Sequence, residues 1–571
     1  MKKFDYIIIG AGSAGCVLAN RLSADPNNKV LLVEAGGPDK NMFIHIPAGC
    51  AKLHKSEVDW GFETESQAHV SNRKIYLPRG KTLGGCSSTN YMAYVRGNKE
   101  DYNDWEKLGN KGWSYEEVLP YFKKSEHNED ITNDYHQQGG ALNVGFSKLF
   151  STPYGKIFID ACKEVGFEEN KDYNGEKQAG VGAFQNTIKK GKRNSAVVAF
   201  LNPIKDRKNL TILTHTHTKK ILIENGEATG IEVFNKKGAT ETYLADKEVI
   251  VSAGTFNSPQ ILMLSGIGNR AALAKHGINC VQELPGVGKN LQDHLMFGVG
   301  GSTKKQDAQN HHLKIRHRVL DLANYILFKK GALTQGPLEC VAFGSTSLSP
   351  DRVDYQLHYA SLNLGEHNEA DIYDFTTYPT TDGVTILPTL LRPKSRGYVQ
   401  LKSSDPKDKV LIQPNFLSAP EDRQVLIEAG RKAIQILKNK RFTEVLEKLY
   451  EGTSLASDED FLKYIQDNLE TVYHPVGTCK MGQDNQAVVD ERLRVHGVNK
   501  LRVIDASIMP TIVSGNTNAP TMMIGEKGAA MILADAQLVN QQANLLESLN
   551  TLQLTQKERV KLKKDGTIEE N

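Results

Sequence analysis

The sequence is poor in features that would assign a protein to a class directly. Only seven of its 571 residues are cysteines, an odd number, and they lie singly with no CxxC pair among them. This pattern favours reduced thiols and offers no metal-binding spacing. No stretch approaches the roughly 18 consecutive apolar residues of a membrane span, and the first apolar run starts at Phe4, which leaves no room for a signal peptide. We therefore expect a cytoplasmic protein, or one that lies peripherally on the cytoplasmic face of the inner membrane.

A strong charge of either sign is also missing. The 70 Lys and Arg residues nearly balance the 67 Asp and Glu residues, and the net charge of +3 gives no electrostatic case for binding nucleic acid. His215 and His217 alternate on one predicted strand, but with no third ligand in view two exposed strand histidines are the simpler interpretation. We expect no metal site, and about two to four folding units for a chain of this length.

What the sequence does contain is one complete dinucleotide-binding unit in its first 36 residues. Residues 4–9 form an apolar, β-branched run that predicts a buried parallel strand, and this run leads directly into Gly10-Ala-Gly12-Ser-Ala-Gly15. Apolar residues then recur at helical spacing, and residues 30–33 form a second apolar strand that ends in Glu34. This order of strand, glycine-rich turn, helix, strand and acid indicates a site for an ADP moiety.

Each glycine of the turn has a physical role. Gly10 permits the tight turn, Gly12 lets the backbone approach a pyrophosphate, and Gly15 lets the helix lie close to the strand. The helix N-terminus presents free N–H groups and a positive dipole end to the phosphates. Glu34 can accept hydrogen bonds from an unphosphorylated ribose diol. These residues alone leave FAD and NAD open, because both cofactors carry the same ADP half.

A second glycine-rich segment, GKTLGGCSSTNYMAYVRG at 80–97, follows a polar, loop-like stretch. Its three glycines, small hydroxyl residues and Asn90 predict a backbone that packs tightly against a planar or anionic group. An ordinary glycine-rich loop is the alternative. Further on, short strands at 210–213, 219–223 and 230–234 predict a β-meander, and 248–252 predicts a return strand to the first sheet.

Three segments together resemble the glucose–methanol–choline (GMC) family of FAD oxidoreductases: the Gly10 unit, the GKTLGG segment and GTFNSPQILMLSGIG at 254–268. LPGVGKNLQDH at 284–294 is similar to another stretch of that family, and the resemblance covers about residues 4–535. It implies that the cofactor is FAD, with the second glycine-rich motif against the flavin and the pyrophosphate. Cys86 and Thr89 depart from the family pattern. Some members carry a histidine covalently bonded to the flavin at the position of Thr89, so its absence implies non-covalent FAD.

The resemblance also implies an α/β fold, in which a doubly wound, Rossmann-type FAD-binding domain is interleaved with a substrate-binding domain that contains an antiparallel sheet. We place the FAD-binding domain at residues 1–150, 206–300 and 475–535, the substrate-binding domain at 151–205 and 301–474, and a C-terminal tail at 536–571. The residues expected to bind FAD are Gly10, Gly12, Ser13, Ala14, Gly15, Glu34, Ala35, Gly80, Thr82, Leu83, Gly84, Gly85, Ser87, Asn90, Tyr91, Met92, Ala93, Thr218, Ala253, Gly254, Asp505, Ala506, Thr517 and Thr521.

YHPVGTCKMG at 473–482 is where the resemblance places the chemistry. His474 is held before Pro475 in a rigid, non-helical turn, and the family's base falls on this residue. An imidazole there can take the hydroxyl proton of an alcohol while hydride leaves the carbinol carbon for the flavin N5. The family's second active-site residue falls on Asn518, which can donate to the alkoxide oxygen but cannot act as a base. The presence of both residues argues against the alternative of a flavin-binding scaffold without turnover.

The expected substrate is a medium-chain primary alcohol, oxidised to its aldehyde, with electrons passed to a quinone or other respiratory acceptor. Choline dehydrogenase and an oxygen-using alcohol oxidase are the alternatives. Glu339 could be a carboxylate for a cationic substrate, but a hydrogen-bonded rim residue is the simpler interpretation. No tryptophan lies in the substrate segment, although an aromatic cage for choline is left open by Tyr355, Tyr359, Tyr373, Phe375 and Tyr378.

Beyond residue 534 the resemblance ends. Leu538, Leu545, Leu549 and Leu552 share a helical face, and the basic stretch QKERVKLKKDG follows. This combination suits a helix that lies on a membrane surface. A solvated tail helix or an oligomer contact explains the same pattern equally well, and the oligomeric state is left open.

Overall fold

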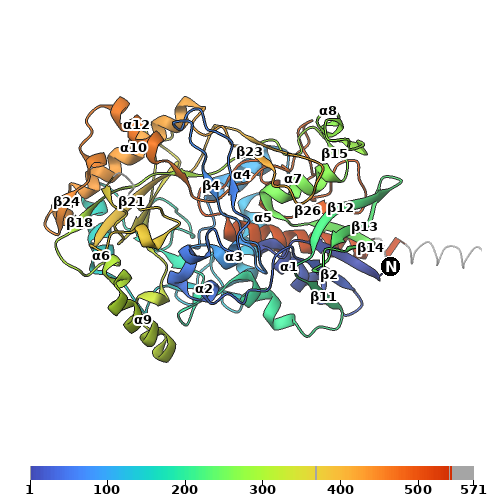
Figure 1. Ribbon diagram of the computed structural model, residues 1–571, viewed down its shortest axis with the longest axis horizontal. Helices are drawn as coiled ribbons and strands as arrows, with labels where there is room; N and C mark the ends of the chain where they lie inside the picture. Colours follow the sequence, from blue (N-terminus) through green and yellow to red (C-terminus); the bar gives the residue numbers. More distant parts are fainter. Residues whose placement is uncertain (1, 367–369, 539–540, 543–571) are drawn as a thin grey trace, which may run out of the picture.

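Two β-sheets organise the computed structural model, which describes residues 2–366, 370–538 and 541–542 (Figure 1). One sheet lies beside the N-terminus, and the other lies at the opposite end of the long axis of the molecule. The helix over residues 518–538, drawn in red, runs through the middle of the view. This mixed α/β arrangement with two lobes is the fold class that the sequence predicts.

The first sheet, here called the cofactor sheet, has a parallel core. Its central strand β1 (Lys2–Ile9) pairs with β2 (Val30–Val33) on one side and with β14 (Thr240–Val251) on the other. β11 (Leu210–Leu213) extends the sheet beyond β2, and β26 (Leu501–Val503) extends it beyond β14. All four residues of β2 are buried, as expected for a strand covered on both faces.

β14 is the strand that joins this parallel core to the β-meander. Its first half pairs antiparallel with β13 (Glu227–Phe234), which pairs in turn with β12 (His217–Glu224). Its second half pairs in parallel with β26. The predicted meander is therefore confirmed for 219–223 and 230–234, but 210–213 lies in the parallel core beside β2, and the separate return strand at 248–252 is wrong. That segment continues a 12-residue strand whose neighbours change along its length.

The second sheet, here called the substrate sheet, is antiparallel, as predicted. α10 (Pro420–Leu437) and α6 (Pro153–Glu164) pack against the sheet and against each other, and α12 (Asp458–Asn468) packs on α10. These helices therefore cover one face of the sheet. Along its main path the strands, in spatial order, are β24 (Leu446–Leu449), β18 (Val299–Thr303), β21 (Gly383–Leu390), β20 (Tyr355–Ala360), β19 (Leu338–Gly344) and β7 (Gly180–Ala183).

Two segments pack in the lobe opposite to the one that the sequence boundaries gave them. The π-helix η2 (Val197–Leu201) lies in the core of the cofactor sheet against α1 (Ser13–Leu22), and Asn20 donates its side-chain amide to the carbonyl oxygen of Phe200 at 2.7 Å. β17 (Leu295–Met296) pairs with β21 and so belongs to the substrate sheet. The apolar content of both segments suits either core, which is why composition did not place them.

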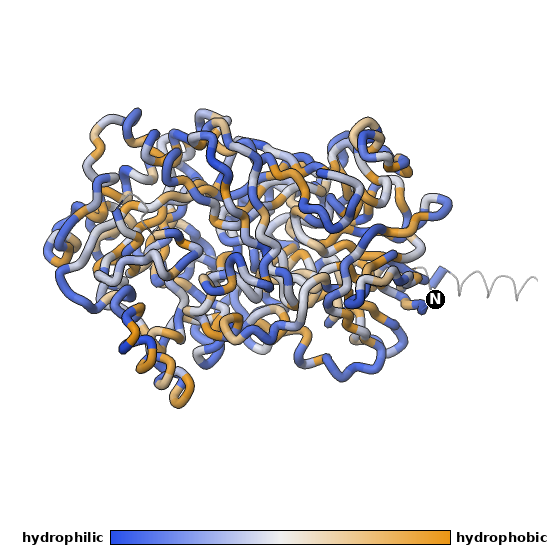
Figure 2. Tube along the Cα trace, in the orientation of Figure 1, coloured by the Kyte–Doolittle hydropathy of each residue, from blue (hydrophilic) through white to orange (hydrophobic). Residues whose placement is uncertain are grey.

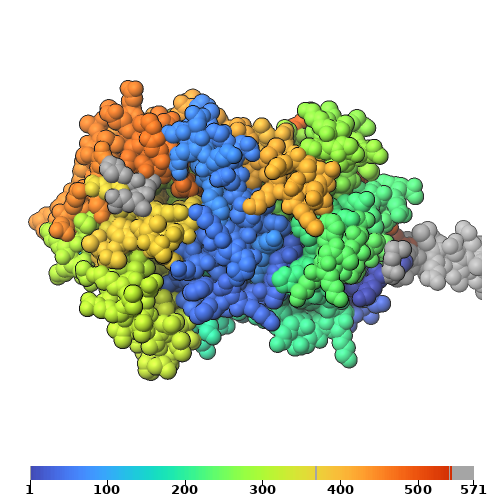
Figure 3. All heavy atoms as spheres, viewed as in Figure 1, coloured from blue at the N-terminus to red at the C-terminus, as the bar shows by residue number. Residues whose placement is uncertain are grey.

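Two surface features complete the fold. The segment after β2, coloured blue, crosses the middle of the face seen in Figure 3, between the two lobes. α9 (Ile315–Phe328) projects from the edge of the substrate lobe, and Figure 2 shows orange, hydrophobic positions along it. Among the described residues, no helix is both long and apolar enough to cross a bilayer. The predicted tail helix lies largely outside the described residues.

Candidate active site

The glycine-rich turn after β1 is shaped by close backbone contacts. Gly10 has φ of 100°, a conformation that L side chains rarely adopt, and a Cβ there would lie 2.4 Å from the carbonyl oxygen of Ser252. A Cβ on Gly15 would lie 1.9 Å from the carbonyl oxygen of Gly10. At Gly12 the nearest atom is 4.0 Å away, so this glycine faces open space. The three positions thus have the geometry that their predicted roles require.

The second glycine-rich segment packs directly on this turn. The backbone N–H of Gly84 donates to the carbonyl oxygen of Ala11 at 2.7 Å. A Cβ on Gly85 would lie 2.9 Å from the Cα of Gly12. Because neither contact leaves room for a side chain, the two segments form one continuous cradle, which here is called the glycine cradle.

A single large cavity runs from the glycine cradle to the substrate sheet. Both residues predicted to be catalytic, His474 and Asn518, line it. Most residues predicted to bind the cofactor also line it: Gly10, Gly12, Ser13, Ala14, Glu34, Ala35, Gly80, Gly85, Asn90, Tyr91, Met92, Ala93, Thr218, Ala253, Gly254, Asp505, Ala506, Thr517 and Thr521.

The remaining predicted cofactor residues stand behind the cavity wall rather than in it. Gly15 and Gly84 make the backbone contacts described above, and Leu83 packs against the cofactor core. The Thr82 hydroxyl donates to the carbonyl oxygen of Gly37 at 3.0 Å. The Ser87 hydroxyl donates to the carbonyl oxygen of Gly84 at 2.7 Å. These side chains brace the loop because their polar atoms already have partners within it.

The two histidines predicted to be exposed on a strand differ from each other. His215 is exposed, but it precedes β12 and has φ of 53°. His217 is partly buried in the cavity wall, where its Nε2 lies 2.8 Å from the carbonyl oxygen of Pro406. The exposed-strand interpretation is therefore wrong for His217, because the loop that carries Pro406 covers it.

The carboxylates that line the cavity, among the described residues, are Glu34 and Asp505. Glu34 accepts the backbone N–H of Ala11 at 2.9 Å and that of Gly36 at 2.7 Å. Burial raises its pKa to about 7. Each of its oxygens keeps a second lone pair, so Glu34 retains acceptor capacity for a ribose diol. Asp505 accepts the Gly254 N–H at 2.9 Å and so ties β26 to the turn after β14.

The imidazole of His474 is oriented by a second histidine. Nε2 of His294 lies 3.0 Å from the carbonyl oxygen of Leu391, which can only accept, so this nitrogen carries a proton. Burial lowers the pKa of His294 to about 3, so the ring is neutral and its Nδ1 is an acceptor. That Nδ1 lies 3.0 Å from Nδ1 of His474, which must therefore donate. Nε2 of His474 therefore carries a lone pair, which the side-chain nitrogen of Asn516 approaches at 3.2 Å.

The backbone around His474 holds this geometry. Its N–H and that of His294 both donate to one oxygen of the buried Asp293 side chain, at 2.8 and 2.9 Å. Tyr473, directly before His474, has φ of 62°, which is unusual for a bulky residue. Its carbonyl oxygen accepts a hydrogen bond from Arg79. Burial, followed by the nearby His294, lowers the pKa of His474 well below 6.5, so the ring stays neutral at neutral pH.

Two asparagines approach the site in different ways. Asn518, at the start of the helix over 518–538, donates its side-chain amide to the Ser13 hydroxyl at 2.8 Å. Asn516 places its side-chain nitrogen 3.2 Å from Nε2 of His474, and its Oδ1 is buried without a partner. Asn516 rather than Asn518 therefore contacts His474 in this structure, and both asparagines line the cavity.

The wall that the substrate lobe contributes is largely aliphatic. It includes Met296, Leu338, Leu362, Leu364, Ile372 and Leu387. Glu339 is not part of it. Its carboxylate lies in the core behind β19, where it accepts hydrogen bonds from the Thr152 backbone N–H and hydroxyl at 3.2 and 3.0 Å and from the Gln309 amide at 3.0 Å. The hydrogen-bonded interpretation of Glu339 is thus confirmed, although the residue is buried rather than at a rim.

His294, Asp293 and Asn516 are the site residues that sequence reasoning missed. His294 and Asp293 close the LPGVGKNLQDH motif, which was identified only as a mark of the family. Two adjacent polar residues at the end of a motif, in a segment expected to be buried, are the signal that was available. Asn516 has no such signal, because NTN at 516–518 offers two asparagines and only the fold separates their contacts.

The cavity fits a flavin dinucleotide by its own geometry. Gly254, with φ of 82°, would present an added Cβ to nothing within 4 Å, so its open side faces the cavity. Oδ1 of Asn257 and Oδ1 of Asn516 are buried acceptors without a partner, and both residues line the cavity. Polar atoms left in this way are expected where a bound group supplies donors. The glycine cradle, the Glu34 carboxylate and the N-terminus of α1 then suit the ADP half of the cofactor.

These features define an FAD-dependent oxidoreductase, and comparison with known proteins gives its family. The family models of GMC oxidoreductases match residues 4–296 and 393–525, so the chain belongs to that family and acts on CH–OH donors. It is 42% identical to alcohol dehydrogenase [acceptor] of Pseudomonas putida, over 95% of this chain and 98% of the relative. It is 40% identical to oxygen-dependent choline dehydrogenase of Sinorhizobium fredii, over 94% and 96%.

A solved structure supports the same conclusion. A variant of formate oxidase from Aspergillus oryzae, made to study FAD modification, superposes with a TM-score of 0.87 at 29% identity, covering 94% of this chain and 99% of that one. The predicted family, fold class, cofactor and enzyme class are therefore confirmed.

Proposed function

We propose that the protein oxidises medium-chain primary alcohols to aldehydes, with His474 as the base. The observation that carries the proposal is the hydrogen-bond chain from the carbonyl oxygen of Leu391 through His294 to His474. This chain leaves Nε2 of His474 unprotonated, with a lone pair that only the neutral amide of Asn516 approaches, at 3.2 Å, and both residues line the cavity. FAD, when bound, supplies the hydride acceptor.

The residues of the chain divide the remaining work. Nε2 of His474 takes the hydroxyl proton, and its Nδ1–H stays bonded to His294, which fixes the ring during the transfer. Asn518, the alkoxide partner that the family resemblance implies, donates to the substrate oxygen after exchanging its Ser13 contact. Asn516 is the second candidate for this donor, because it already lies beside Nε2.

The aliphatic wall of the substrate lobe favours an alkyl chain. Each CH₂ group buried there contributes roughly 0.8 kcal/mol, which is about fourfold in kcat/KM per methylene until the pocket is filled. The lining carboxylates, Glu34 and Asp505, both come from the cofactor sheet side. A quaternary ammonium would therefore find no negative partner in that wall among the described residues.

Anaerobic reduction of the bound flavin by ethanol, butanol, octanol and choline tests this proposal. We expect bleaching of the flavin absorbance to become faster from ethanol to octanol. Choline reducing the flavin faster than octanol would overturn the substrate class. Glu339→Gln is the matched variant for the choline alternative. This variant should leave the order of the four substrates unchanged, because the Glu339 carboxylate lies in the core rather than in the cavity.

Choline remains a second candidate because aromatic rings cluster near the site. His54 has ring-centroid distances of 5.3 Å to Tyr373 and 6.0 Å to both Tyr91 and Tyr473. His54, Tyr91 and Tyr473 line the cavity. Such rings can hold a quaternary ammonium through cation–π contacts. Replacing Tyr473 with leucine should weaken choline binding selectively if this candidate is correct, and should leave the KM ratio of choline to butanol unchanged if it is not.

The expected electron acceptor is a quinone, in keeping with the P. putida relative, which is named for an unspecified acceptor. Turnover with a quinone analogue or dye should exceed hydrogen peroxide release in air. Comparable rates would make the protein an oxidase. FAD should also be held non-covalently, because Thr89 in the cavity wall offers no histidine for a bond. Acid precipitation should then release all the flavin, and flavin left on the pellet would contradict this.

We further propose that α9 docks the protein peripherally on an anionic lipid surface. Val319, Leu320, Ile326, Leu327 and Phe328 are each at least 60% exposed, whereas Tyr325 is the buried residue of the helix. Basic residues surround this apolar surface. They are Arg316, Arg318 and Lys330 around the helix, and Lys189, Lys190 and Lys192 on the β-hairpin whose Gly191 approaches the end of α9.

Charge complementarity is the reason to choose anionic lipid. In the described part of the chain none of these six cations forms an ion pair, so they are available to lipid phosphates. The FAD-loaded protein should sediment with phosphatidylglycerol vesicles and much less with phosphatidylcholine vesicles. Leu320→Ser combined with Leu327→Ser should abolish sedimentation, whereas Leu108→Ser, a similarly exposed leucine elsewhere, should not. Equal sedimentation of the two variants would overturn the assignment to α9.

A further inference from the structure

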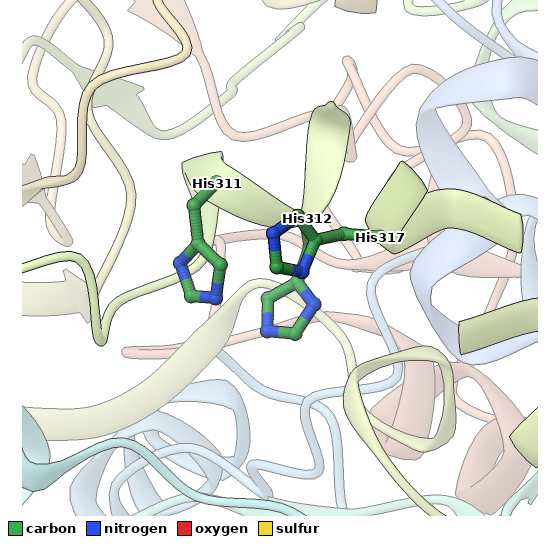
Figure 4. A group of neighbouring side chains, drawn as sticks. All are labelled: His311, His312 and His317. Carbon is green, nitrogen blue, oxygen red and sulfur yellow. The ribbon is translucent and has the colours of Figure 1, made fainter. Parts of the chain in front are cut away.

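Three histidines at the base of α9 form a cluster that neither the cofactor nor the substrate uses. His311 lies on the short helix η4 (Asn310–Leu313), next to His312, and His317 lies in the first turns of α9. Figure 4 shows the three rings gathered against one another at this junction. One ring nitrogen from each lies within 4.8 Å of the other two. None of the three residues lines the active-site cavity.

Two of these rings are oriented by carboxylates. Nδ1 of His311 lies 2.8 Å from an oxygen of Asp382, and Nδ1 of His312 lies 2.7 Å from an oxygen of Asp321. Asp382 is fully buried and is itself held by the backbone N–H groups of Ala308 and His311, both at 2.6 Å. With Nδ1 engaged in this way, Nε2 is the nitrogen that each ring has free. A carboxylate behind each imidazole is the arrangement that orients histidine ligands of metals.

We propose that His311, His312 and His317 bind one Zn²⁺ ion, with water completing the coordination. Imidazole nitrogens suit zinc, which is typically four-coordinate, with Zn–N bonds of about 2.0–2.1 Å. Tetrahedral ligands at that bond length lie about 3.3 Å apart, so small side-chain rotations close the observed spacing.

The site would fasten α9 to the body of the molecule. Two side-chain contacts tie the helix to its surroundings: Asp321 contacts His312, and the Tyr325 hydroxyl donates to the carbonyl oxygen of His45 at 3.3 Å. The helix also packs against the short helix at 332–334. A bound ion would add a second attachment at the N-terminal end, across the break between η4 and α9. This inference does not depend on the proposed function. It departs from the sequence expectation of no metal, which considered only the cysteines and the pair at 215 and 217.

Zinc titration of the FAD-loaded, tag-free protein, stripped of metal by chelator dialysis, tests the proposal. We expect one Zn²⁺ per chain by calorimetry, and a visible absorption band of tetrahedral Co²⁺ when cobalt replaces zinc. His317→Ala should weaken binding by about tenfold or more, and Asp321→Asn by about 10–100-fold, the range for loss of an orienting carboxylate. His276→Ala is the matched control, because it removes a comparably half-exposed histidine outside the cluster.

A second readout does not use affinity. Zinc should slow hydrogen exchange of residues 311–328 in the parent protein and in His276→Ala, but not in His317→Ala. If the parent protein and His317→Ala bind zinc equally, or if zinc leaves exchange in this segment unchanged in both, the three histidines are a surface cluster only and the proposal is wrong. Loss of binding in His276→Ala to the same extent would overturn it as well.

Discussion

The molecule contains two histidine clusters whose neighbours give them opposite chemistry. Nε2 of His294 donates to the carbonyl oxygen of Leu391, and its Nδ1 meets Nδ1 of His474. Burial keeps both rings neutral, so Nε2 of His474 can serve as the proposed base. At the foot of α9, His311 and His312 are each joined through Nδ1 to a carboxylate, which orients the ring. One ring nitrogen from each of the three histidines lies within 4.8 Å of the other two. The residue type alone therefore does not set the chemistry. The group behind each ring does.

Burial sharpens the contrast. The active-site pair is enclosed, and burial lowers the pKa of both rings. The cluster at α9 keeps 14% and 22% of the side chains of His311 and His312 exposed, so it is open to an ion from solution. We expect changes at the first cluster to alter catalysis and changes at the second to alter metal binding alone.

Removing the base should have the largest effect. His474→Ala should bind FAD and yet reduce the rate of flavin reduction by alcohol by about 10²–10⁴-fold, the range for loss of positioned acid–base catalysis. The flavin spectrum of the purified variant is the control for folding and cofactor binding. A variant that reduces its flavin at the parent rate would place the base elsewhere in the cavity.

Replacing the second histidine should have a smaller effect. His294→Phe fills the same buried space but leaves the Nδ1–H of His474 without its acceptor, which costs about 1–3 kcal/mol, or roughly 5- to 150-fold in rate. The loss should appear in kcat rather than KM, because His294 does not line the cavity. A change confined to KM would indicate that the ring only shapes the pocket.

The two asparagines can be ranked in the same assay. If Asn518 donates to the alkoxide, Asn518→Ala should slow flavin reduction by about tenfold or more, but less than His474→Ala does. Asn516→Ala should then cause a smaller loss, through the orientation of Nε2. The reverse order would assign the alkoxide contact to Asn516, in agreement with its position at 3.2 Å from the base.

The cofactor half of this site could be predicted from the sequence because its constraints are local. Gly10, Gly12 and Gly15 are required by backbone contacts within one turn, and Glu34 follows one strand later. The substrate half depends on contacts between distant segments. His294 meets His474 across 180 positions, and the burial of Glu339 depends on Thr152. No pattern within a short window encodes such pairs.

The same reasoning explains the missed cluster at α9. His311 and His312 are adjacent and His317 follows five residues later, across a break between two helices. That spacing matches no familiar zinc motif. The two carboxylates that orient the rings are separated from them in the sequence. Asp321 lies further along α9, and Asp382 lies directly before β21. The exposure of α9 has no signal in the sequence either, because apolar composition normally indicates burial.

The pH dependence of flavin reduction tests whether the active-site histidine is neutral, and the expected change is smaller than those caused by the substitutions above. Since the pKa of His474 lies well below 6.5, its base form is fully present at neutral pH and is lost only as pH falls through that lowered value. Flavin reduction should therefore change by less than about twofold between pH 8 and 6.5, as one deprotonated base requires. A rate that falls with an apparent pKa near 7 in stopped-flow measurements would show that the ring titrates freely.

The smallest effect is expected from the exposed cluster on catalysis. His317→Ala should leave the rate of flavin reduction by butanol within about twofold of the parent, with and without added Zn²⁺, because surface changes outside the site rarely matter more. The reason is geometric: none of the three histidines lines the cavity, and Tyr325 holds α9 to His45 independently of them. Metal binding should nevertheless be weakened in the same preparation. If the variant instead lost both zinc and alcohol oxidation, the two clusters would be coupled through the substrate lobe, and their independence, on which this comparison rests, would be wrong.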